Sequence, residues 1–443
     1  MIVTYKDFVL LLLQLPVCYI FIGLLSKKIT PELRQHFKIG ILIKLAACVI
    51  LGLVYLYYYQ AGDTLSYFSN SKMVTNEILS HPGNTFKYLF SSEDDFSRYF
   101  NSYLDPSISY YYNTPNLTLI KIAAVCNFVS LSSFFGTGFI FCFFSYLGLW
   151  KLFLVFYRSY PDIGKKFVLI LYIPSVVFWG SGILKDSFCL GCIGIVIYLV
   201  NGLHSLSIKS AIKLLIVGIC LYLIWLIKPY IFFCLIIPLV IWRYSFYLIR
   251  LRKRLSIKTI VMINVVVFLF VYKFAHITER LNAISLEDMY LEILKTRAGF
   301  IGDDDGSSFS LGEFTPTVWG FIQQIPSAVT AVLFRPYVWE SKKIFSLIAA
   351  GESLLILSST ILVIAKAHVK TTIKNVLRNP DILFCFFFTL LFAIALGISV
   401  SNFGALVRFK IQFLPFFVIG LLLIYYRKGT RTVTDNSETT IDQ

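Results

Sequence analysis

The sequence predicts an all-α polytopic integral membrane protein with about eleven transmembrane helices. Of its 443 residues, 57% are hydrophobic and only 14% are charged, whereas soluble domains are roughly a quarter charged. Apolar stretches long enough to cross roughly 30 Å of hydrocarbon recur along the whole chain. We therefore expect a single transmembrane domain over residues 1–428 and a disordered cytoplasmic tail at 429–443.

The predicted spans are apolar runs separated by polar turns. They cover about 5–25, 38–59, 135–157, 167–181, 187–203, 210–227, 230–248, 257–275, 344–366, 381–400 and 410–426. The spans at 167–181 and 187–203 are short for a membrane crossing. The stretch 117–131 is also short and is broken by polar residues, so it predicts a re-entrant or interfacial helix.

Basic residues in the loops predict the orientation. A net charge of +16 would suggest nucleic acid as the partner of a soluble protein, but here the bases lie between apolar spans and indicate topology and contact with anionic lipid. They are Lys27, Lys28, Arg34 and Lys38; Arg158, Lys165 and Lys166; Lys209 and Lys213; Arg243, Arg250, Arg252, Lys253, Arg254 and Lys258; Lys366, Lys370, Lys374 and Arg378; and Arg427 and Lys428. The positive-inside rule then predicts the N-terminus outside and the C-terminus inside. Counting 117–131 as a full span would put two basic loops on the wrong side.

Two long loops remain on the outer side, at about 60–134 and 276–342. Both contain more acidic than basic residues. Each includes a stretch with apolar residues at helical spacing, from Ser69 to Leu79 and from Val318 to Leu333. This pattern predicts helices that lie on the membrane surface.

Polar residues gather in five groups, all of which the predicted topology places at the outer membrane boundary. The groups are Gly62-Asp63-Thr64 with Tyr67; Lys185-Asp186; Lys228-Pro229-Tyr230; Arg335 to Glu340, which includes Trp339; and Asn402, Arg408 and Lys410. Five separate turns on one face indicate a functional site more strongly than any single motif does.

The residue types in these groups suit a charged, lipid-linked substrate. Lys185, Lys228, Arg335 and Arg408 are candidate phosphate-binding residues, because an arginine grips phosphate oxygens with two donors and a lysine supplies a point charge. A carboxylate such as Asp63 activates a hydroxyl or holds a divalent cation. Tyrosine and tryptophan stack on sugar faces while they anchor at headgroup level.

Each group also has a purely structural interpretation. In this interpretation Asp63 is the N-cap of the following helix. Lys185 and Asp186 then form a salt-bridged hairpin tip. Lys228 and Arg408 then reach lipid phosphates along the surface, and Arg335 is an interface anchor. From the residues alone both interpretations stay open.

Glu352 differs because it lies about 14 Å into its span, counting roughly 1.5 Å per residue from Lys343. A carboxylate at that depth is paired or functional, and the sequence leaves open whether it pairs with Arg408 or is protonated. A transporter or flippase needs polar residues along a path across the membrane. Glu352 is the one deep charge identified, so the sequence disfavours this alternative without excluding it. A non-catalytic assembly factor is a further alternative.

The segment Gly62-Asp63-Thr64 with Tyr67, following an initial helix, a basic turn and a second helix, resembles the EpsG-like, Wzy-like polysaccharide polymerases. More broadly, the chain resembles the GT-C superfamily of membrane glycosyltransferases, and the stretch from Pro174 to Asp186 is similar to a segment of that group. The resemblance implies an enzyme that moves a sugar or glycan from a polyprenyl-phosphate or polyprenyl-diphosphate carrier to an acceptor. It implies Asp63 as catalytic base or as a ligand of Mg²⁺ or Mn²⁺. Asp63 departs from the superfamily's commonest form because no second acid adjoins it, which leaves the metal open.

The expected setting is a bacterial inner membrane, since Met is scarce and Ile abundant. The expected partners are the polyprenyl-linked donor, a glycan or other acceptor, and membrane lipids, with no nucleic acid. The sequence contains no G-x-x-x-x-G-K-[ST] phosphate loop, G-x-S-x-G elbow or H-E-x-x-H motif. ATP-driven transport and serine hydrolysis therefore have no support.

Overall fold

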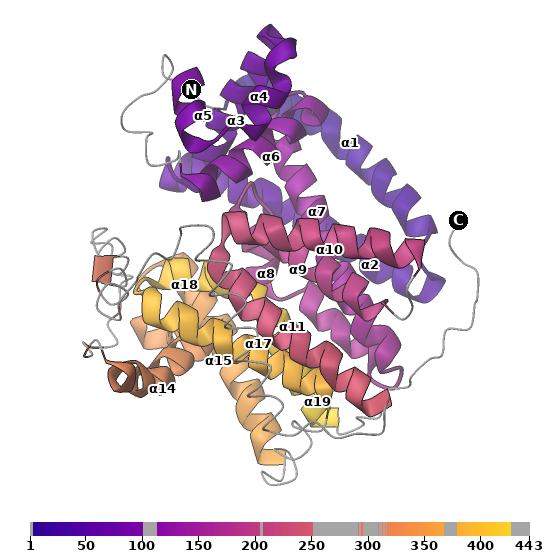
Figure 1. Ribbon diagram of the computed structural model, residues 1–443, viewed down its shortest axis with the longest axis vertical. Coiled ribbons are helices and arrows are strands. Elements are labelled where there is room, and N and C mark those ends of the chain that lie inside the picture. The colour runs from indigo at the N-terminus through magenta and orange to yellow at the C-terminus, as the bar shows by residue number, and fades with distance from the viewer. Residues whose placement is uncertain are drawn as a thin grey trace. The chain divides into compact units, whose positions relative to one another are not determined.

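A computed structural model of the chain describes residues 3–100, 113–203, 207–250, 317–366 and 379–426, together with 291, 294–295, 309, 312 and 315 (Figure 1). Within these ranges every regular element is a helix, as predicted. Seven of the described helices are long and apolar enough to cross a membrane. The predicted span at 257–275 and the predicted tail at 429–443 lie outside the described residues.

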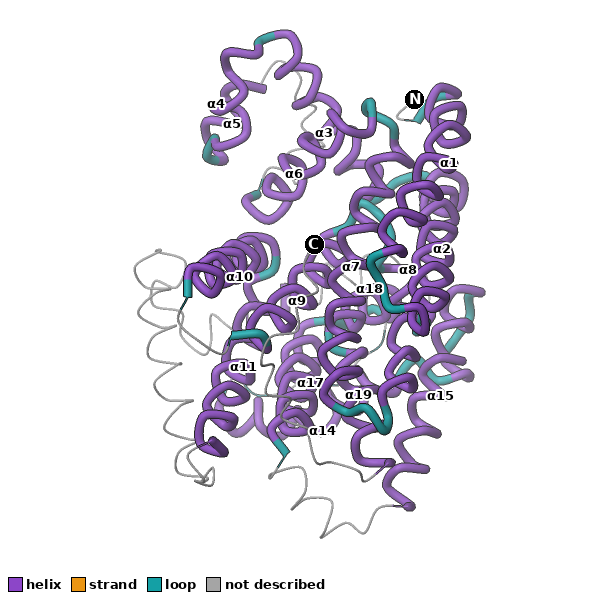
Figure 2. Tube along the Cα trace, turned by 90° about the vertical axis from the view of Figure 1, so that its right-hand side faces the viewer, coloured by secondary structure: helices purple, strands orange, loops and turns teal. Residues whose placement is uncertain are grey.

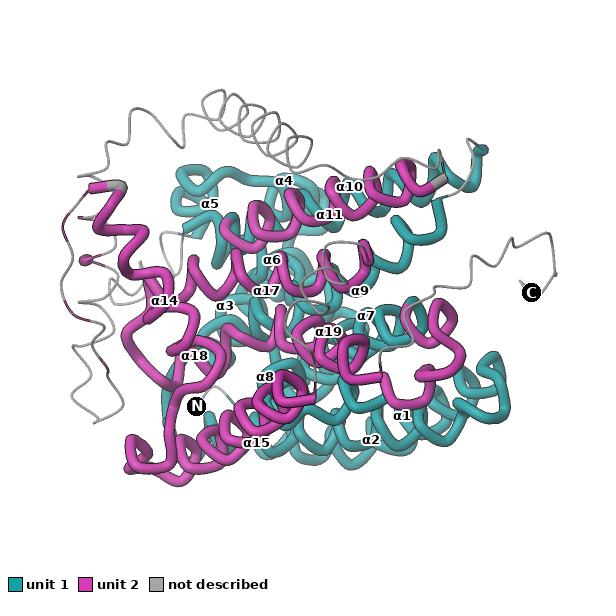
Figure 3. The backbone as a smooth tube through the Cα atoms, turned by 90° about the horizontal axis from the view of Figure 1, so that it is seen from below, with its two compact units in different colours: residues 1–155, 168–229 teal, residues 156–167, 230–443 magenta. Residues whose placement is uncertain are grey.

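The chain divides into two compact units, which Figure 3 draws in teal and magenta. Unit 1 comprises residues 1–155 and 168–229, and unit 2 comprises 156–167 and 230–443. The single domain expected over 1–428 stays a prediction, and each unit is described by itself below.

Unit 1 carries the helices of the first half of the chain. They are α1 (Tyr5–Lys27), α2 (Pro31–Leu53), the π-helix η1 (Val54–Tyr59), α3 (Asp63–Ser80), η2 (Pro82–Asn84), α4 (Thr85–Phe90), α5 (Glu93–Phe100), α6 (Thr114–Ser130), most of α7 (Phe134–Ser159), α8 (Pro174–Trp179), α9 (Lys185–Asn201) and α10 (Ile208–Ile227). The predicted outer loop 60–134 is therefore largely helical. In it α3 packs along α6, as Figure 2 also shows.

Unit 2 carries the remaining helices. They are α11 (Pro229–Arg250), α14 (Val318–Phe334), η6 (Val338–Glu340), α15 (Ile344–Lys366), α17 (Pro380–Ser399), α18 (Phe403–Phe409), η7 (Lys410–Gln412) and α19 (Leu414–Tyr426), while η5 (Gly164–Leu171) runs across the division between the units. Caps set several starts: the Thr317 hydroxyl accepts from Gly320 N–H to begin α14, and Asn379 Oδ1 accepts from Asp381 N–H to begin α17. Helix α14 packs on α17 and α17 on α19.

Seven predicted spans coincide with helices that pass the length and hydropathy test for a membrane crossing. These helices are Tyr5–Lys27, Pro31–Tyr59, Phe134–Ser159, Ile208–Ile227, Pro229–Ile249, Ile344–Lys366 and Pro380–Ser399. The predicted amphipathic segments also form helices, α3 and α14. Span number and orientation beyond these seven stay predictions.

The predicted span at 167–181 is not one continuous helix. The chain forms the 3₁₀ helix η5, breaks before Pro174 and continues in the six-residue α8. The reason is local: the residue before a proline is disfavoured in the α region, and Ile173 has extended angles, φ −61° and ψ 120°. The neighbouring α9 is 17 residues long.

The predicted span at 410–426 is likewise bent. Two helices form this span, Phe403–Gln412 and Leu414–Tyr426, and they meet at 62°. They pass the length and hydropathy test for a membrane crossing as a pair. Pro415 lies in the first turn of the second piece. Proline has no N–H and is favoured in the first turn of a helix, so Pro415 suits a new start at Leu414.

Helices α7 and α9 of unit 1 approach so closely that only glycine fits at the crossing. A Cβ on Gly148 would lie 2.2 Å from Gly191 O, and one on Gly194 would lie 2.0 Å from Gly148 O. Small residues at helix crossings are typical of membrane bundles, because they let the backbones touch.

We therefore predict that Gly148→Ala lowers the free energy of unfolding by about 1–3 kcal/mol, since the added methyl group overpacks the crossing. Thermal unfolding of the detergent-purified protein measures it. The matched control is Gly23→Ala in α1, where a Cβ meets no atom within 4 Å. Equal stability of the two variants would contradict the packing described here.

Candidate functional site

In unit 1, Asp63 is placed by a sharp change of chain direction after the π-helix. Gln60 has φ +55° and Gly62 has φ +117°, a conformation that favours glycine. A Cβ on Gly62 would also lie 2.8 Å from the Tyr55 ring. Gly62 occupies the N-cap and Asp63 is the first residue of α3, with no side-chain capping hydrogen bond formed at the N-cap. The carboxylate thus stands at the positive end of the helix dipole, one residue after the N-cap position.

Tyr67 lies one helical turn beyond Asp63 and is 2% exposed. Its hydroxyl donates to Asn116 Oδ1 of α6 at 2.8 Å. Lys185 Nζ lies 5.9 Å from the centroid of the Tyr67 ring, which is within the range of a cation–π contact. The structure therefore brings two of the predicted groups together at this ring.

Asp186 and Lys228 form a buried ion pair between the start of α9 and the end of α10. Asp186 is fully buried and Lys228 is 7% exposed. Asp186 lies in the first turn of α9, and Lys228 is the C-cap of α10. Each charge therefore complements the dipole of its own helix as well as its partner. The hairpin-tip alternative pairs Lys185 with Asp186, whereas in the structure Asp186 pairs with Lys228, 42 residues away.

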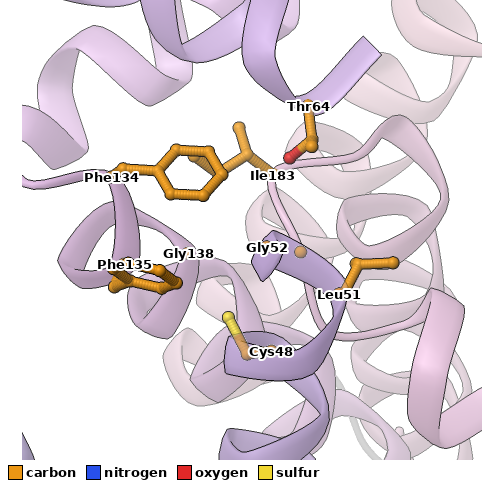
Figure 4. A pocket seen from close by; sticks show the side chains of 9 residues that line it. Cys48, Leu51, Gly52, Thr64, Phe134, Phe135, Gly138 and Ile183 are labelled. Atoms are coloured by element: carbon orange, nitrogen blue, oxygen red, sulfur yellow. The ribbon is translucent and has the colours of Figure 1, made fainter. Parts of the chain in front are cut away.

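The turn between α8 and α9 lies close to α2 and to the start of α3. A Cβ on Gly182 would lie 2.5 Å from Leu51 Cδ2 of α2 and 3.8 Å from Thr64 Oγ1 of α3. A cavity of about 10 Å³, room for about one water molecule, is lined from both sides by Cys48 and Thr64 and by Ile183 of the turn (Figure 4). Three of the five predicted groups thus gather within unit 1, at the N-termini of α3 and α9 and the C-terminus of α10.

Unit 2 holds the other two groups around Arg335. Its guanidinium lies 4.7 Å from the Phe309 ring and 5.2 Å from the Phe403 ring. It donates from Nε to Glu340 Oε2 at 3.1 Å and from Nη2 to Oε1. Asn402 Oδ1 accepts from Gly404 N–H at 2.8 Å and so starts α18, the helix that carries Phe403. Asn402 therefore has a structural role.

The other predicted residues of unit 2 are more exposed. Trp339 is 82% exposed and stacks on Tyr337, with ring centroids 4.8 Å apart. Arg408 is half-buried, with its guanidinium 5.6 Å from the Phe409 ring. A side chain as exposed as Trp339 suits an interfacial anchor or a surface that stacks on a ligand.

Glu352 lies within a polar network. It is 7% exposed and interacts electrostatically with Lys410, which is fully buried. Lys410 Nζ donates to Ser353 Oγ at 3.1 Å, and Ser353 Oγ donates to Arg335 O at 3.2 Å. The sequence left open whether Glu352 pairs with Arg408 or is protonated. The structure adds a third possibility, because Lys410 was not considered as a partner of Glu352.

Several buried polar residues of the described part of the chain were not predicted from the sequence. Lys44 of α2 is fully buried in unit 1, so Glu352 is not the only deep charge. In unit 2, Asp381 accepts from Tyr160 Oη at 2.7 Å and from Trp242 Nε1 at 2.8 Å. A lone lysine inside an apolar run was a sequence signal that could have identified Lys44. Only the fold brings Tyr160, Trp242 and Asp381 together.

Among the described residues, no group of three or more His, Cys, Asp or Glu side chains is placed to hold a metal ion. The Mg²⁺ or Mn²⁺ that the resemblance implies therefore has no ligand set in this part of the chain. Comparison with protein families, with characterised proteins and with solved structures finds no match to the chain. The geometry of the two units is thus the basis for assigning a function.

We predict that Lys228→Met destabilises the protein by roughly 3–5 kcal/mol, because it removes the ammonium that faces the buried Asp186 carboxylate. The double variant Asp186→Asn/Lys228→Met should recover most of this loss, since both charges are then gone. Thermal unfolding in detergent measures both, with the exposed Lys209→Met on the same helix as control. A double variant as unstable as the single one would rule out a buried charge pair.

The pair of Arg335 and Glu340 predicts a pH effect. Partial burial alone would raise the pKa of Glu340, but hydrogen bonds from Arg335 and from Tyr337 N–H outweigh it and lower the pKa from its ordinary value of 4.5. A carboxyl group with a depressed pKa stabilises the fold above its unfolded-state pKa and loses that contribution as pH falls through the folded pKa. Wild type should therefore lose its stability advantage over Glu340→Gln below about pH 4.5, in thermal unfolding from pH 6 to pH 3. An advantage that persists to pH 3 would contradict this assignment.

Proposed function

We propose that the protein is a membrane glycosyltransferase or polysaccharide polymerase of GT-C type. In this proposal it transfers a sugar or glycan from a polyprenyl-phosphate or polyprenyl-diphosphate carrier to an acceptor. The reaction takes place at the outer face of a bacterial inner membrane. The chain then crosses the membrane about eleven times, with the N-terminus outside and the C-terminus inside.

One observation carries the proposal: within unit 1, a carboxylate, a half-buried lysine and a buried tyrosine gather where α3 and α9 begin. Asp63 and Tyr67 share one face of α3, and Lys185 lies over the Tyr67 ring. Glycosyl transfer from a phosphate carrier needs a base for the acceptor and a cation for the leaving group. The cluster offers both, and Thr64 of α3 lies near Gly182 in the turn that leads into α9.

The proposed chemistry follows from these positions. Asp63 takes the proton of the acceptor hydroxyl while the hydroxyl oxygen attacks the anomeric carbon of the donor sugar. The bond from that carbon to the carrier phosphate breaks, and Lys185 stabilises the negative charge on the departing phosphate. Asp186 and Lys228 hold the start of α9 and contribute to the local field. Arg335 and Arg408 are the proposed phosphate-binding residues of unit 2.

The test is mass spectrometry of carrier-linked glycans in cells that lack the protein, complemented with wild type or Asp63→Asn at matched expression. We expect the deletion to accumulate an unextended carrier-linked precursor that wild type clears. Asp63→Asn should clear it at least roughly a hundredfold more slowly, which is the usual contribution of a general base.

Asp162→Asn is the matched control, because Asp162 is exposed and lies in the turn after α7, outside the unit 1 cluster. It should clear the precursor at the wild-type rate. If Asp63→Asn does so too, Asp63 is not the base and the site assignment is wrong.

The Glu352–Lys410 network favours a second candidate, translocation of a lipid-linked glycan. Both residues are buried in helices that form candidate spans or part of a bent pair, and charges inside spans mark transport pathways in many carriers. Translocation predicts a fully extended precursor that accumulates on the inner leaflet. Transfer predicts an unextended one, so the same deletion strain separates the two.

A further inference from the structure

Lys44 is a fully buried lysine near the middle of the candidate span Pro31–Tyr59. Burying an ammonium among apolar residues is costly unless its donors are satisfied, and a charge inside a span is functional more often than not. The proposed chemistry does not use Lys44, so its presence needs another explanation.

The contacts of Lys44 lead to the break between α8 and α9. Its Nζ donates to Ser145 Oγ of α7 at 2.9 Å and to the backbone carbonyl of Gly180. Gly180 is the C-cap of α8, so the ammonium stands at the negative end of that short helix. A cation there both satisfies a terminal carbonyl and complements the helix dipole.

Nearby hydroxyls and backbone amides donate to other carbonyls at the break. Ser181 Oγ donates to Val177 O, and Ser187 Oγ donates to the carbonyls of Gly182 and Leu184. Gly180 O instead takes its donor from Lys44, 136 residues away. This bond therefore ties the break to α2 rather than to its own neighbours in sequence.

Two glycines let α2 come this close. A Cβ on Gly180 would lie 2.7 Å from Lys44 Nζ, and one on Gly182 would lie 2.5 Å from Leu51 Cδ2. Lys44 and Leu51 are seven residues apart and share one face of α2, which thus supports the turn at both glycines. A cavity of about 10 Å³ also borders the turn at Gly182 and Ile183.

We infer that Lys44 is a positioning residue: it holds the α8–α9 break so that Lys185 and Asp186 start α9 against Tyr67 and Lys228. The inference rests on the proposed function only in assigning Lys185 to the carrier phosphate. The restraint itself is a property of the fold and has its own test.

The first measurement is hydrogen exchange, by mass spectrometry, of the full-length protein in lipid nanodiscs. In Lys44→Met, backbone amides of residues 181–186 should exchange at least about tenfold faster than in wild type, because the break opens locally once its carbonyl loses its donor. Gly180→Ala should do the same, because its methyl group would meet Val176 O at 2.4 Å and Lys44 Nζ at 2.7 Å and so disturbs the same break. The controls are Lys38→Met, exposed on the same helix, and Gly218→Ala, where a Cβ meets no atom within 4 Å.

Faster exchange confined to the break supports the inference. If residues 181–186 exchange within about twofold of the wild-type rate, the inference is overturned. The loss of one buried hydrogen bond predicts a larger change in rate than that. Equal acceleration throughout unit 1 would also overturn it, because Lys44 would then be a general stability residue.

The second measurement is the rate of carrier-glycan transfer. Lys44→Met should slow transfer at least about tenfold while Lys38→Met does not, and adding Lys44→Met to Lys185→Met should cost nothing further, since residues that act through one another are not additive. Additive losses would overturn the inference. If wild type transfers no glycan, the proposed function fails, while the exchange measurement still decides the role of Lys44.

Discussion

A helix that breaks among apolar side chains must find hydrogen-bond partners inside the protein, because hydrocarbon offers none. The described part of unit 1 is organised around one such break, between α8 and α9. Serine hydroxyls donate to three of its carbonyls, and Lys44 of α2 donates to the carbonyl of Gly180. The direction in which α9 leaves the break decides that Asp186 meets Lys228 and that Lys185 lies over Tyr67.

Side chains of opposite charge lie close together at three places among the described residues. Asp186 faces Lys228, Glu340 faces Arg335, and Lys410 lies within electrostatic reach of Glu352. The first of these pairs also uses helix ends, where the partial charges of the backbone add to those of the side chains. Pairs held in this way need little rearrangement when a charged substrate approaches, and this is the condition under which fixed charges stabilise a transition state most effectively.

The function proposed here comes from the chemistry of a site rather than from the fold. Membrane helices of this length and hydropathy occur in transporters, scaffolds and enzymes alike. What favours transfer is the carboxylate at the start of α3, which follows a glycine with positive φ. Tyr67 lies one turn further along the same helix, and Lys185 of α9 lies over its ring. The resemblance seen in Gly62-Asp63-Thr64 agrees with that proposal.

The sequence by itself determined the all-helical class and seven of the candidate spans, because hydrocarbon thickness sets the length of an apolar helix. It also placed α3 and α14, whose apolar residues recur at helical spacing. It named Asp63, Lys185, Asp186 and Lys228 as a set, but it could not pair them.

Only the tertiary structure decided that Asp186 pairs with Lys228 rather than with its neighbour, and that Lys410 is a cation near Glu352. It likewise revealed that Lys44 supports the break at Gly180. The physical reason is that helix formation depends on residues within a few turns of one another. Pairing of buried polar groups depends instead on which helices the packing of glycines and apolar faces brings into contact, across separations of 42 and 136 residues.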